Sequence, residues 1–258
     1  MLLVIDLGNT NTVFGVYREE RLLRSWRLST ERDRTVDEYG LLARNLFALD
    51  GLDAAAVESV IIASVVPPLE STLTRMVEVY FGAHPVFVTA ENAGVPVLYD
   101  DPREVGADRL MDAVAVIERY GGPAIVVDLG TATTFNIITA NNEYLGGLIA
   151  PGVEVSARAL IERAAKLPRV EIRRPEVLIG RSTRASLESG FFWGYVSLVD
   201  GVLGRLQNEL GQDTRVIATG GWAALIAREC PRITASDPDL TLQGLVSVAR
   251  RLGLAGSG

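Results

Sequence analysis

Two segments of the chain place an aspartate and a run of small polar residues directly after an apolar stretch. The first is Asp6-Leu7-Gly8-Asn9-Thr10-Asn11-Thr12-Val13, which follows the apolar residues 2–5. The second is Asp128-Leu129-Gly130-Thr131-Ala132-Thr133-Thr134, which follows residues 124–127. Glycine allows a sharp turn and a close approach to a ligand, and backbone N–H groups, hydroxyls and amides can surround phosphate oxygens. Each segment is therefore a candidate phosphate-binding hairpin.

The two segments are copies of one pattern. When Asp6 is aligned with Asp128, 122 positions later, the copies match at the aspartate, the leucine, the glycine and the final threonine. A single copy would more often be an ordinary tight hairpin, because short motifs carry false positives. The repetition over half of the chain favours two similar lobes with a nucleotide phosphate chain between them. This duplication resembles the actin-like, ribonuclease-H-like ATPase fold.

A third candidate site lies where an irregular polar segment, residues 91–109, leads into a helix. It contains Tyr99 and ends in Gly106-Ala107-Asp108-Arg109. Long polar loops in compact domains are often functional. An aspartate at a helix start also has a purely structural explanation, because acids favour that end of the helix dipole. Arginine gains nothing there from the dipole, so Arg109 favours recognition of an anionic ligand.

Composition excludes several other kinds of site. The single histidine, His84, cannot form a multi-histidine metal site, and it lies far in sequence from any acid-rich motif, so acid–base chemistry falls to carboxylates. The single cysteine, Cys230, excludes an internal disulfide and a zinc-type cysteine cluster. A net charge of −7 and a pI near 4.9 argue against nucleic acid as an obligate partner. No apolar run approaches a membrane span, and Asp6 interrupts the apolar N-terminus, so we expect a cytoplasmic protein without a membrane partner.

The elements that would position these residues alternate between strands and helices. In the first half, the pattern predicts strands at 2–7, 12–17, 22–28, 60–66 and 86–88. Thr35 and Glu38 predict a capping box before a helix through residue 47, Pro67-Pro68 starts a second helix, and residues 106–117 form a third. The order predicts an α/β fold with a mixed sheet covered by helices.

The second half repeats this plan. Strands are expected at 124–128, 133–139, 144–150 and 216–218, and helices at 153–165 and 186–210. The long helix carries aromatic residues and glycines between Gly190 and Gly204, a surface that fits either a dimer interface or the core. Gly220 and Gly221 form a strand-to-helix turn where a flat ring could lie against the backbone, which in this fold would bind adenosine.

Taken together, these motifs resemble the type III pantothenate kinase family. The resemblance covers essentially the whole chain, in order. It rests on the two aspartate loops, on Tyr99, on residues 106–109, and on three further segments: Gly146–Gly152, Ile179–Thr183 and Ala218–Gly221. It implies a duplicated actin-like fold with two βββαβα-type lobes around a central cleft. We place the lobes at residues 1–115 and 116–258.

The resemblance also implies a reaction and a set of roles. The γ-phosphate of ATP would pass to the primary hydroxyl of pantothenate, the first step of coenzyme A biosynthesis, in a homodimer that needs Mg²⁺ with ATP and a monovalent cation, K⁺ or NH₄⁺. Asp108 would be the general base, Asp128 would bind the monovalent cation, and Asp6 the divalent one. The ATP-binding set would be Asp6, Leu7, Gly8, Asn9, Thr10, Asn11, Thr12, Val13, Thr131, Gly220 and Gly221. The pantothenate-binding set would be Tyr99, Gly106, Ala107, Asp108, Arg109 and Thr183, with Thr183 reaching across the dimer interface.

Two positions depart from the family pattern. Asn136 stands where many relatives have aspartate, and Arg181-Ser182 replaces a commoner Lys-Asn. Both lie beside motif residues, so they bear on substrate contacts more than on the reaction. Two alternatives remain at this point: a kinase of the same fold that phosphorylates a sugar or a carboxylate such as acetate, and a nucleotide-regulated binding protein. Most of the latter would need inserted subdomains, for which 258 residues leave no room.

Overall fold

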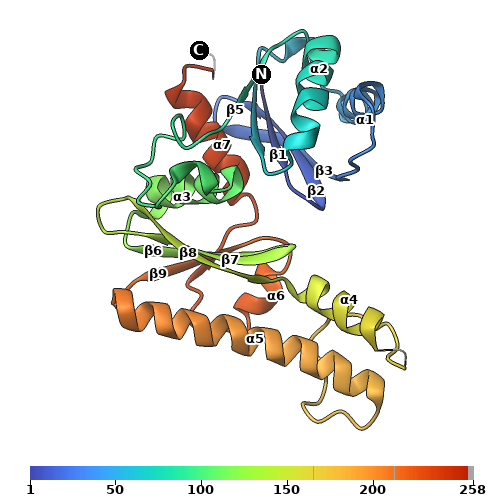
Figure 1. Ribbon diagram of the computed structural model, residues 1–258. Helices are drawn as coiled ribbons and strands as arrows, with labels where there is room; N and C mark the ends of the chain where they lie inside the picture. Colours follow the sequence, from blue (N-terminus) through green and yellow to red (C-terminus); the bar gives the residue numbers. More distant parts are fainter. Residues whose placement is uncertain (165, 212, 255–258) are drawn as a thin grey trace. The chain divides into compact units, whose positions relative to one another are not determined.

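The protein is described by a computed structural model for residues 1–164, 166–211 and 213–254 (Figure 1). The chain divides into two compact units, and each is a sheet covered by helices. The first unit contains residues 1–120 together with the C-terminal segment that begins at Asp239, and the second contains residues 121–238. The C-terminal segment thus folds with the N-terminal half of the chain.

The first unit is built on a five-stranded mixed sheet. Its strands are β1 (Leu2–Leu7), β2 (Asn11–Arg18), β3 (Arg21–Ser29), β4 (Ser59–Ser64) and β5 (Pro85–Phe87), in the order β3-β2-β1-β4-β5. β1, β2 and β3 form an antiparallel meander, and β4 and β5 continue the sheet in parallel with β1. The predicted meander and the predicted mixed sheet are therefore confirmed.

Helices pack against both faces of this sheet. The long ones are α1 (Val36–Leu49), α2 (Glu70–Phe81), α3 (Ala107–Tyr120) and α7 (Leu240–Arg251), and the short 3-10 turns are η1 (Ala54–Ala56), η2 (Pro67–Leu69) and η3 (Pro102–Glu104). The predicted capping box at the start of α1 is present, because Thr35 Oγ1 accepts from the Glu38 backbone N–H and the Glu38 carboxylate accepts from the Thr35 N–H. α1 and α2 contact each other, as do α3 and α7.

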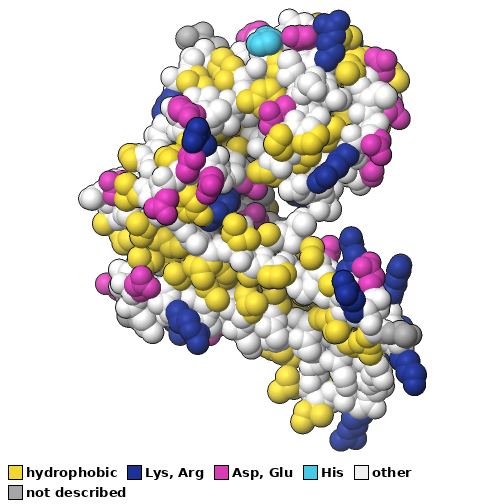
Figure 2. Space-filling view, in the orientation of Figure 1, with side chains coloured by type: hydrophobic (Ala, Val, Ile, Leu, Met, Phe, Trp, Pro, Cys, Tyr) yellow, Lys and Arg dark blue, Asp and Glu magenta, His cyan; other side chains and the backbone are white. Residues whose placement is uncertain are grey.

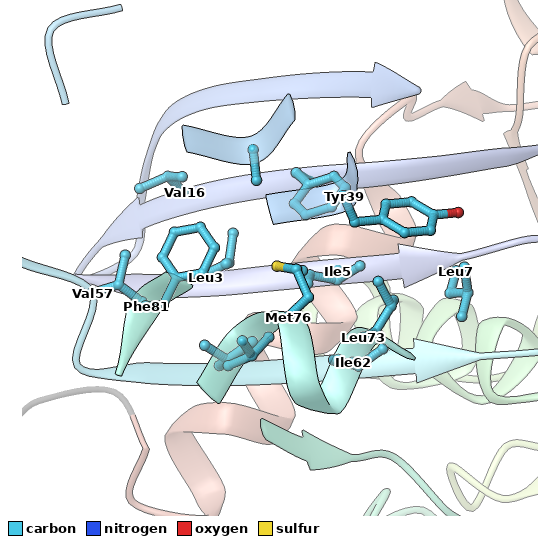
Figure 3. Close-up of a cluster of buried hydrophobic side chains, with 14 of the residues drawn as sticks. Leu3, Ile5, Leu7, Val16, Tyr39, Val57, Ile62, Leu73, Met76 and Phe81 are labelled. Carbon is cyan, nitrogen blue, oxygen red and sulfur yellow. The ribbon is translucent and has the colours of Figure 1, made fainter. Parts of the chain in front are cut away.

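The alternation of side chains along β1 decides which residues can reach the site. Leu3, Ile5 and Leu7 belong to the cluster formed with α1 and α2 (Figure 3). Successive strand residues point to opposite faces, so Leu2, Val4 and Asp6 lie on the other face. That face carries α7, because Leu242 of α7 approaches Gly15 next to Val4. Asp6 therefore shares the sheet face of α3 and α7.

The second unit repeats the architecture of the first. Its strands are β6 (Ala124–Leu129), β7 (Ala132–Ile138), β8 (Tyr144–Pro151), β9 (Arg215–Thr219) and β10 (Ala235–Ser236), in the order β10-β9-β6-β7-β8. Read from β8, this order and the strand directions are those of the first sheet. The duplicated fold that the repeated loops predict is present, and β1 and β6 occupy equivalent central positions.

The helices of the second unit are α4 (Val153–Arg163), α5 (Thr183–Leu210) and α6 (Ala223–Ala227). The expected start of the long helix at Ser186 is wrong: α5 begins at Thr183, because Ser182 caps it by accepting a 3.2 Å hydrogen bond from the Ala185 N–H. α4 ends at Arg163, two residues before the predicted end, and Ala165 lies outside the described residues.

The aromatic residues of α5 serve the core of the second unit. Phe192 and Tyr195 are buried against β6 and β7, and Phe191 and Trp193 pack against the same cluster. The exposed side of the helix instead presents Gly190 and Gly194, which have open space where a side chain would lie. Of the two explanations for this aromatic segment, core packing is the one that applies to the aromatic rings.

No helix in the described part of the chain is both long and apolar enough to span a membrane.

Three elements, α6, β10 and α7, come after residue 222 and therefore after the last motif of the sequence. α7 has the apolar spacing of a helix that is buried along one side, and Leu240, Leu245 and Val248 are fully buried.

Candidate active site

The first aspartate loop is the hairpin between β1 and β2. Leu7 pairs with Thr12, and the Gly8 N–H donates to the Asn11 carbonyl at 3.0 Å, which closes the turn. Asn9 and Thr10 are exposed at its tip, while Asp6 is partly buried at the end of β1. The tip therefore offers backbone N–H groups and polar side chains, with a carboxylate one strand residue behind the turn.

The start of α3 carries a carboxylate and a guanidinium side by side. Asp108 is partly buried, and its Oδ1 accepts a 2.7 Å hydrogen bond from the Arg109 backbone N–H. Burial raises the pKa of the Asp108 carboxyl above its ordinary value, and the N–H and the positive charge of Arg109 lower it by less. Arg109 is itself buried, with 7% of its surface exposed. A carboxyl group with a raised pKa beside a buried cation is typical of functional sites.

β4 connects the helix start to the hairpin. The Val65 N–H donates to the Leu7 carbonyl at 3.1 Å, so the end of β4 lies beside the end of β1. A Cβ on Gly106 would lie 3.3 Å from Val65 Cγ1 and 2.5 Å from Asp108 Oδ1. The absence of a side chain at Gly106 thus gives the Asp108 carboxylate its place near the strand ends. The first unit brings Asp6, Gly106, Asp108 and Arg109 to one edge of its sheet.

Tyr99 lies in the irregular segment between β5 and α3 and is partly buried. The segment is held at its start by Asn92, whose side chain accepts from the Thr89 N–H and donates to the Phe87 carbonyl, both at 2.8 Å. Arg251 of α7 donates to the Gly94 carbonyl at 3.0 Å. Hydrogen bonds therefore hold the loop against the residues at the end of β5 and against the C-terminal helix, and they fix its backbone conformation.

The second aspartate loop is the corresponding hairpin between β6 and β7. Its carboxylate, Asp128, is flanked by Gly220, which follows β9 and has a φ of 89°. A Cβ on Gly220 would lie 2.7 Å from the Leu129 carbonyl oxygen and closer still to Asp128 Oδ1. Gly220 thus packs directly against the loop aspartate, whereas a Cβ on Gly221 would meet no atom within 4 Å. The adenosine-binding role of this turn stays a prediction.

Two further contacts define this loop. The Gly152 N–H donates to the Thr131 carbonyl at 3.1 Å, which joins the loop to the start of α4 and leaves Thr131 exposed. Tyr195 of α5 shares a 2.6 Å hydrogen bond with Thr133. Burial raises the pKa of Tyr195 to about 12; the Thr133 hydrogen bond opposes this rise and the nearby Asp128 charge adds to it. The Tyr195 side chain is therefore a neutral phenol at neutral pH, hydrogen-bonded to the loop through Thr133.

The remaining sequence predictions are placed as follows. Thr183 is exposed as the first residue of α5, in the second unit. His84 is exposed, and its Nδ1 lies 3.2 Å from Glu78 Oε1. Among the described residues, no group of three or more His, Cys, Asp or Glu side chains is arranged to hold a metal ion. A cation at either aspartate loop would therefore need backbone or ligand oxygens in addition to the carboxylate.

Asn136 and Ser182, which depart from the family pattern, both have structural roles. Asn136 is fully buried, donates to Thr134 Oγ1 at 3.3 Å and accepts from the Tyr144 hydroxyl at 3.2 Å. Ser182 is the N-cap of α5, and serine and asparagine are interchangeable at that position. Neither departure removes a residue of the predicted site.

Comparisons with known proteins decide the family. The profile of the type III pantothenate kinase family matches residues 2–205. A type III pantothenate kinase of Koribacter versatilis is 51% identical over 256 residues, covering 95% of this chain and 93% of that protein. One of Geobacter sulfurreducens is 52% identical over 246 residues, covering 95% and 96%. The chain belongs to the type III pantothenate kinase family.

Solved structures also share the fold of this chain, although their sequences are much less similar to it than those of the pantothenate kinases above. A candidate 2-dehydro-3-deoxygalactonokinase of Sinorhizobium meliloti aligns with a TM-score of 0.64 at 11% identity, covering 100% of this chain and 99% of that one. Component A of (R)-2-hydroxyglutaryl-CoA dehydratase from Acidaminococcus fermentans aligns with a TM-score of 0.51 at 13% identity, covering 96% and 95%. The actin-like ATPase fold is therefore shared well beyond the pantothenate kinases.

Two positions near these loops were not predicted from the sequence. Thr30, the residue after β3, forms hydrogen bonds to the first hairpin. Thr241 of α7 donates at 2.8 Å to the buried carboxylate of Asp112, one helical turn after Asp108. Neither lies in a motif, and only the three-dimensional arrangement shows the contacts.

Proposed function

We propose that this chain transfers the γ-phosphoryl group of ATP to the primary hydroxyl of pantothenate, forming 4′-phosphopantothenate and ADP, the first step of coenzyme A biosynthesis. The proposal rests on the raised-pKa carboxylate of Asp108, which lies beside buried Arg109 at the same sheet edge as the first phosphate hairpin. Phosphoryl transfer needs mainly positioning and charge neutralisation. A cytoplasmic enzyme is expected, because its phosphoryl donor is ATP.

Asp108 is the general base of the proposed reaction. Its carboxylate accepts the hydroxyl proton of pantothenate as the new O–P bond forms, and the bond between the γ-phosphorus and the bridging oxygen breaks to release ADP. An alcohol has a high pKa, so a base with a raised pKa is better matched to this proton transfer than an ordinary aspartate. Arg109 pairs with the carboxylate of pantothenate, and Tyr99, Gly106 and Ala107 line the same subsite.

The remaining motif residues are proposed to bind the nucleotide. The hairpin from Asp6 to Val13 and the exposed Thr131 contact the phosphates, and the turn at Gly220 and Gly221 contacts adenosine. Asp6 is the proposed carboxylate for Mg²⁺ bound with ATP. These assignments follow the family pattern, and the exposed tip of the first hairpin supports them.

Asp128 is proposed to hold the monovalent cation, K⁺ or NH₄⁺. The donor set fits this role, because the Asp128 carboxylate and the Leu129 carbonyl oxygen lie close together beside Gly220 and both offer oxygen ligands. Oxygen donors of this kind suit hard cations. The bound cation would offset the charge of a carboxylate that faces phosphate.

A homodimer completes the proposed site. Three consecutive apolar residues shortly before α5, Val177, Leu178 and Ile179, are 60%, 67% and 79% exposed. Further exposed apolar side chains, Leu145, Leu148 and Ile149, lie on β8, and hydrophobic side chains gather on the surface of this unit (Figure 2). A second copy of the chain would cover apolar side chains of this kind and bring its Thr183 to the pantothenate subsite.

The test is a panel of acceptors. The protein is incubated with MgATP, K⁺ and pantothenate, a hexose or acetate, and ADP release is followed. Release should depend on pantothenate and should fall by roughly 10²- to 10⁴-fold in Asp108→Asn. Glu104→Gln, which changes an exposed acid four residues earlier, is the matched control and should retain wild-type rates. Release stimulated by another acceptor, and not by pantothenate, would overturn the proposed substrate.

A further inference from the structure

Thr30 forms three hydrogen bonds to the phosphate hairpin from outside it. Its Oγ1 donates to the Gly8 carbonyl at 2.7 Å and lies 2.8 Å from Thr12 Oγ1. Its backbone N–H donates to the Thr10 carbonyl at 2.9 Å. The residue that follows β3 is thereby hydrogen-bonded to three positions of the hairpin.

The proton positions in this network follow from the number of donors. A threonine hydroxyl has a single proton and two acceptor lone pairs. The Thr30 proton is directed to the Gly8 carbonyl, so the hydroxyl of Thr12 donates to Thr30 Oγ1. Thr12 is fully buried, and its hydroxyl therefore depends on partners within the protein. The result is a relay from Thr12 through Thr30 to Gly8.

This relay fixes the orientation of the peptide between Gly8 and Asn9. A trans peptide is planar and carries its C=O and N–H on opposite edges. Because the Gly8 carbonyl points at Thr30, the Asn9 N–H points away from β3, at the exposed tip of the turn. Without the Thr30 hydroxyl this peptide could rotate, and a carbonyl oxygen would then face a bound phosphate in place of an N–H group.

We infer that Thr30 is a positioning residue of the nucleotide site, which acts by holding the Gly8–Asn9 peptide in the orientation that presents an N–H group to ATP phosphate. The inference rests on the proposed function, since it takes the hairpin to be the phosphate loop. Thr30 touches no substrate itself. Its hydroxyl, rather than its size or its backbone, carries the effect.

The test compares Thr30→Val, which keeps the shape and removes the hydroxyl, with Thr30→Ser, which keeps the hydroxyl. Thr74→Val is the matched control, because Thr74 Oγ1 makes a similar 2.8 Å hydrogen bond to the Glu70 carbonyl in α2 of the same unit. Melting temperature, Kd for MgATP measured without pantothenate, and KM for each substrate are determined for all three variants.

Thr30→Val should weaken MgATP binding by roughly 3- to 30-fold, the effect of losing one or two hydrogen bonds. KM for pantothenate should change less than about twofold, Thr30→Ser should restore MgATP binding, and Thr74→Val should leave MgATP binding unchanged. MgATP binding by Thr30→Val equal to that of the wild type would overturn the inference. A loss of MgATP affinity in Thr30→Ser equal to that in Thr30→Val would also overturn the inference, since the hydroxyl would then not be responsible for MgATP binding. A wild-type protein that binds MgATP but does not phosphorylate pantothenate would overturn only the proposed substrate.

Discussion

Replacing Gly220 by alanine should destabilise the second unit and displace Asp128, whereas the same replacement at Gly221 should do neither. Gly220 has a φ of 89°, a conformation that L-residues rarely adopt, and its added Cβ would lie 2.7 Å from the Leu129 carbonyl oxygen and closer to Asp128 Oδ1. Gly221 lies outside that region of φ, is exposed, and has no atom within 4 Å of its added Cβ. The two glycines are neighbours with opposite surroundings.

The expected loss of stability in Gly220→Ala is the sum of two contributions. The left-handed conformation costs a non-glycine residue about 1–2 kcal/mol, and forcing a methyl group into a filled space costs about 1–3 kcal/mol. Their sum, about 2–5 kcal/mol, corresponds to a fall in melting temperature of roughly 4–20 °C for a chain of this size. Gly221→Ala should stay within about 0.5 kcal/mol of the wild type.

The assay is thermal unfolding of both variants, followed by titration of activity with K⁺. Gly220→Ala should need more K⁺ for half-maximal activity, because the Leu129 carbonyl and the Asp128 carboxylate move apart to admit the methyl group. Equal melting temperatures for the two variants would refute the packing argument. A lower melting temperature with an unchanged K⁺ requirement would show that Asp128 does not hold the cation.

Three further predictions concern the reaction. The kcat/KM of the wild type should fall on acidification at a pH above the ordinary aspartate pKa of about 3.9, because burial raises the pKa of Asp108 and the base acts only when deprotonated. Asp108→Asn should lack this fall, and a fall of wild-type kcat/KM only at or below the ordinary aspartate pKa would argue against Asp108 as the base. Replacement of K⁺ by Na⁺ at constant ionic strength should lower turnover strongly, and equal rates would remove the cation role of Asp128. Mixing inactive Asp108→Asn with an inactive Thr183→Trp variant should restore activity after subunit exchange, since one site of each heterodimer has both residues intact; heterodimers without activity would place Thr183 outside the shared site.

Much of the fold can be predicted from local patterns in the sequence. β1 and β6 follow from apolar runs that end in an aspartate and a glycine turn, and β2 and β7 follow from the apolar residues after each turn. α1 follows from its capping box at Thr35 and Glu38. The duplication itself is visible because the two loops keep the same residues at matching positions. These features depend on neighbouring residues, which is why the sequence alone reveals them.

Other features depend on contacts between distant segments. α7 joins the first unit although its sequence follows the second, and Gly244 shows why: an added Cβ would overlap the Met111 backbone of α3, so the two helices touch closely. The hydrogen bonds of Thr30 to Gly8 and Thr10 span about twenty positions and leave no periodic signal. The aromatic residues of α5 could belong to core or interface, and only the packing of Phe192 and Tyr195 assigns them to the core.

The central claim is that the phosphoryl group reaches the primary hydroxyl of pantothenate, and the product itself tests it most directly. The product of a reaction with MgATP, K⁺ and pantothenate is examined by phosphorus NMR and then treated with hydroxylamine. We predict a phosphate ester whose phosphorus couples to the methylene protons of pantothenate and which resists hydroxylamine. A hydroxylamine-labile acyl phosphate, or ADP release without phosphorylated pantothenate, would contradict the account.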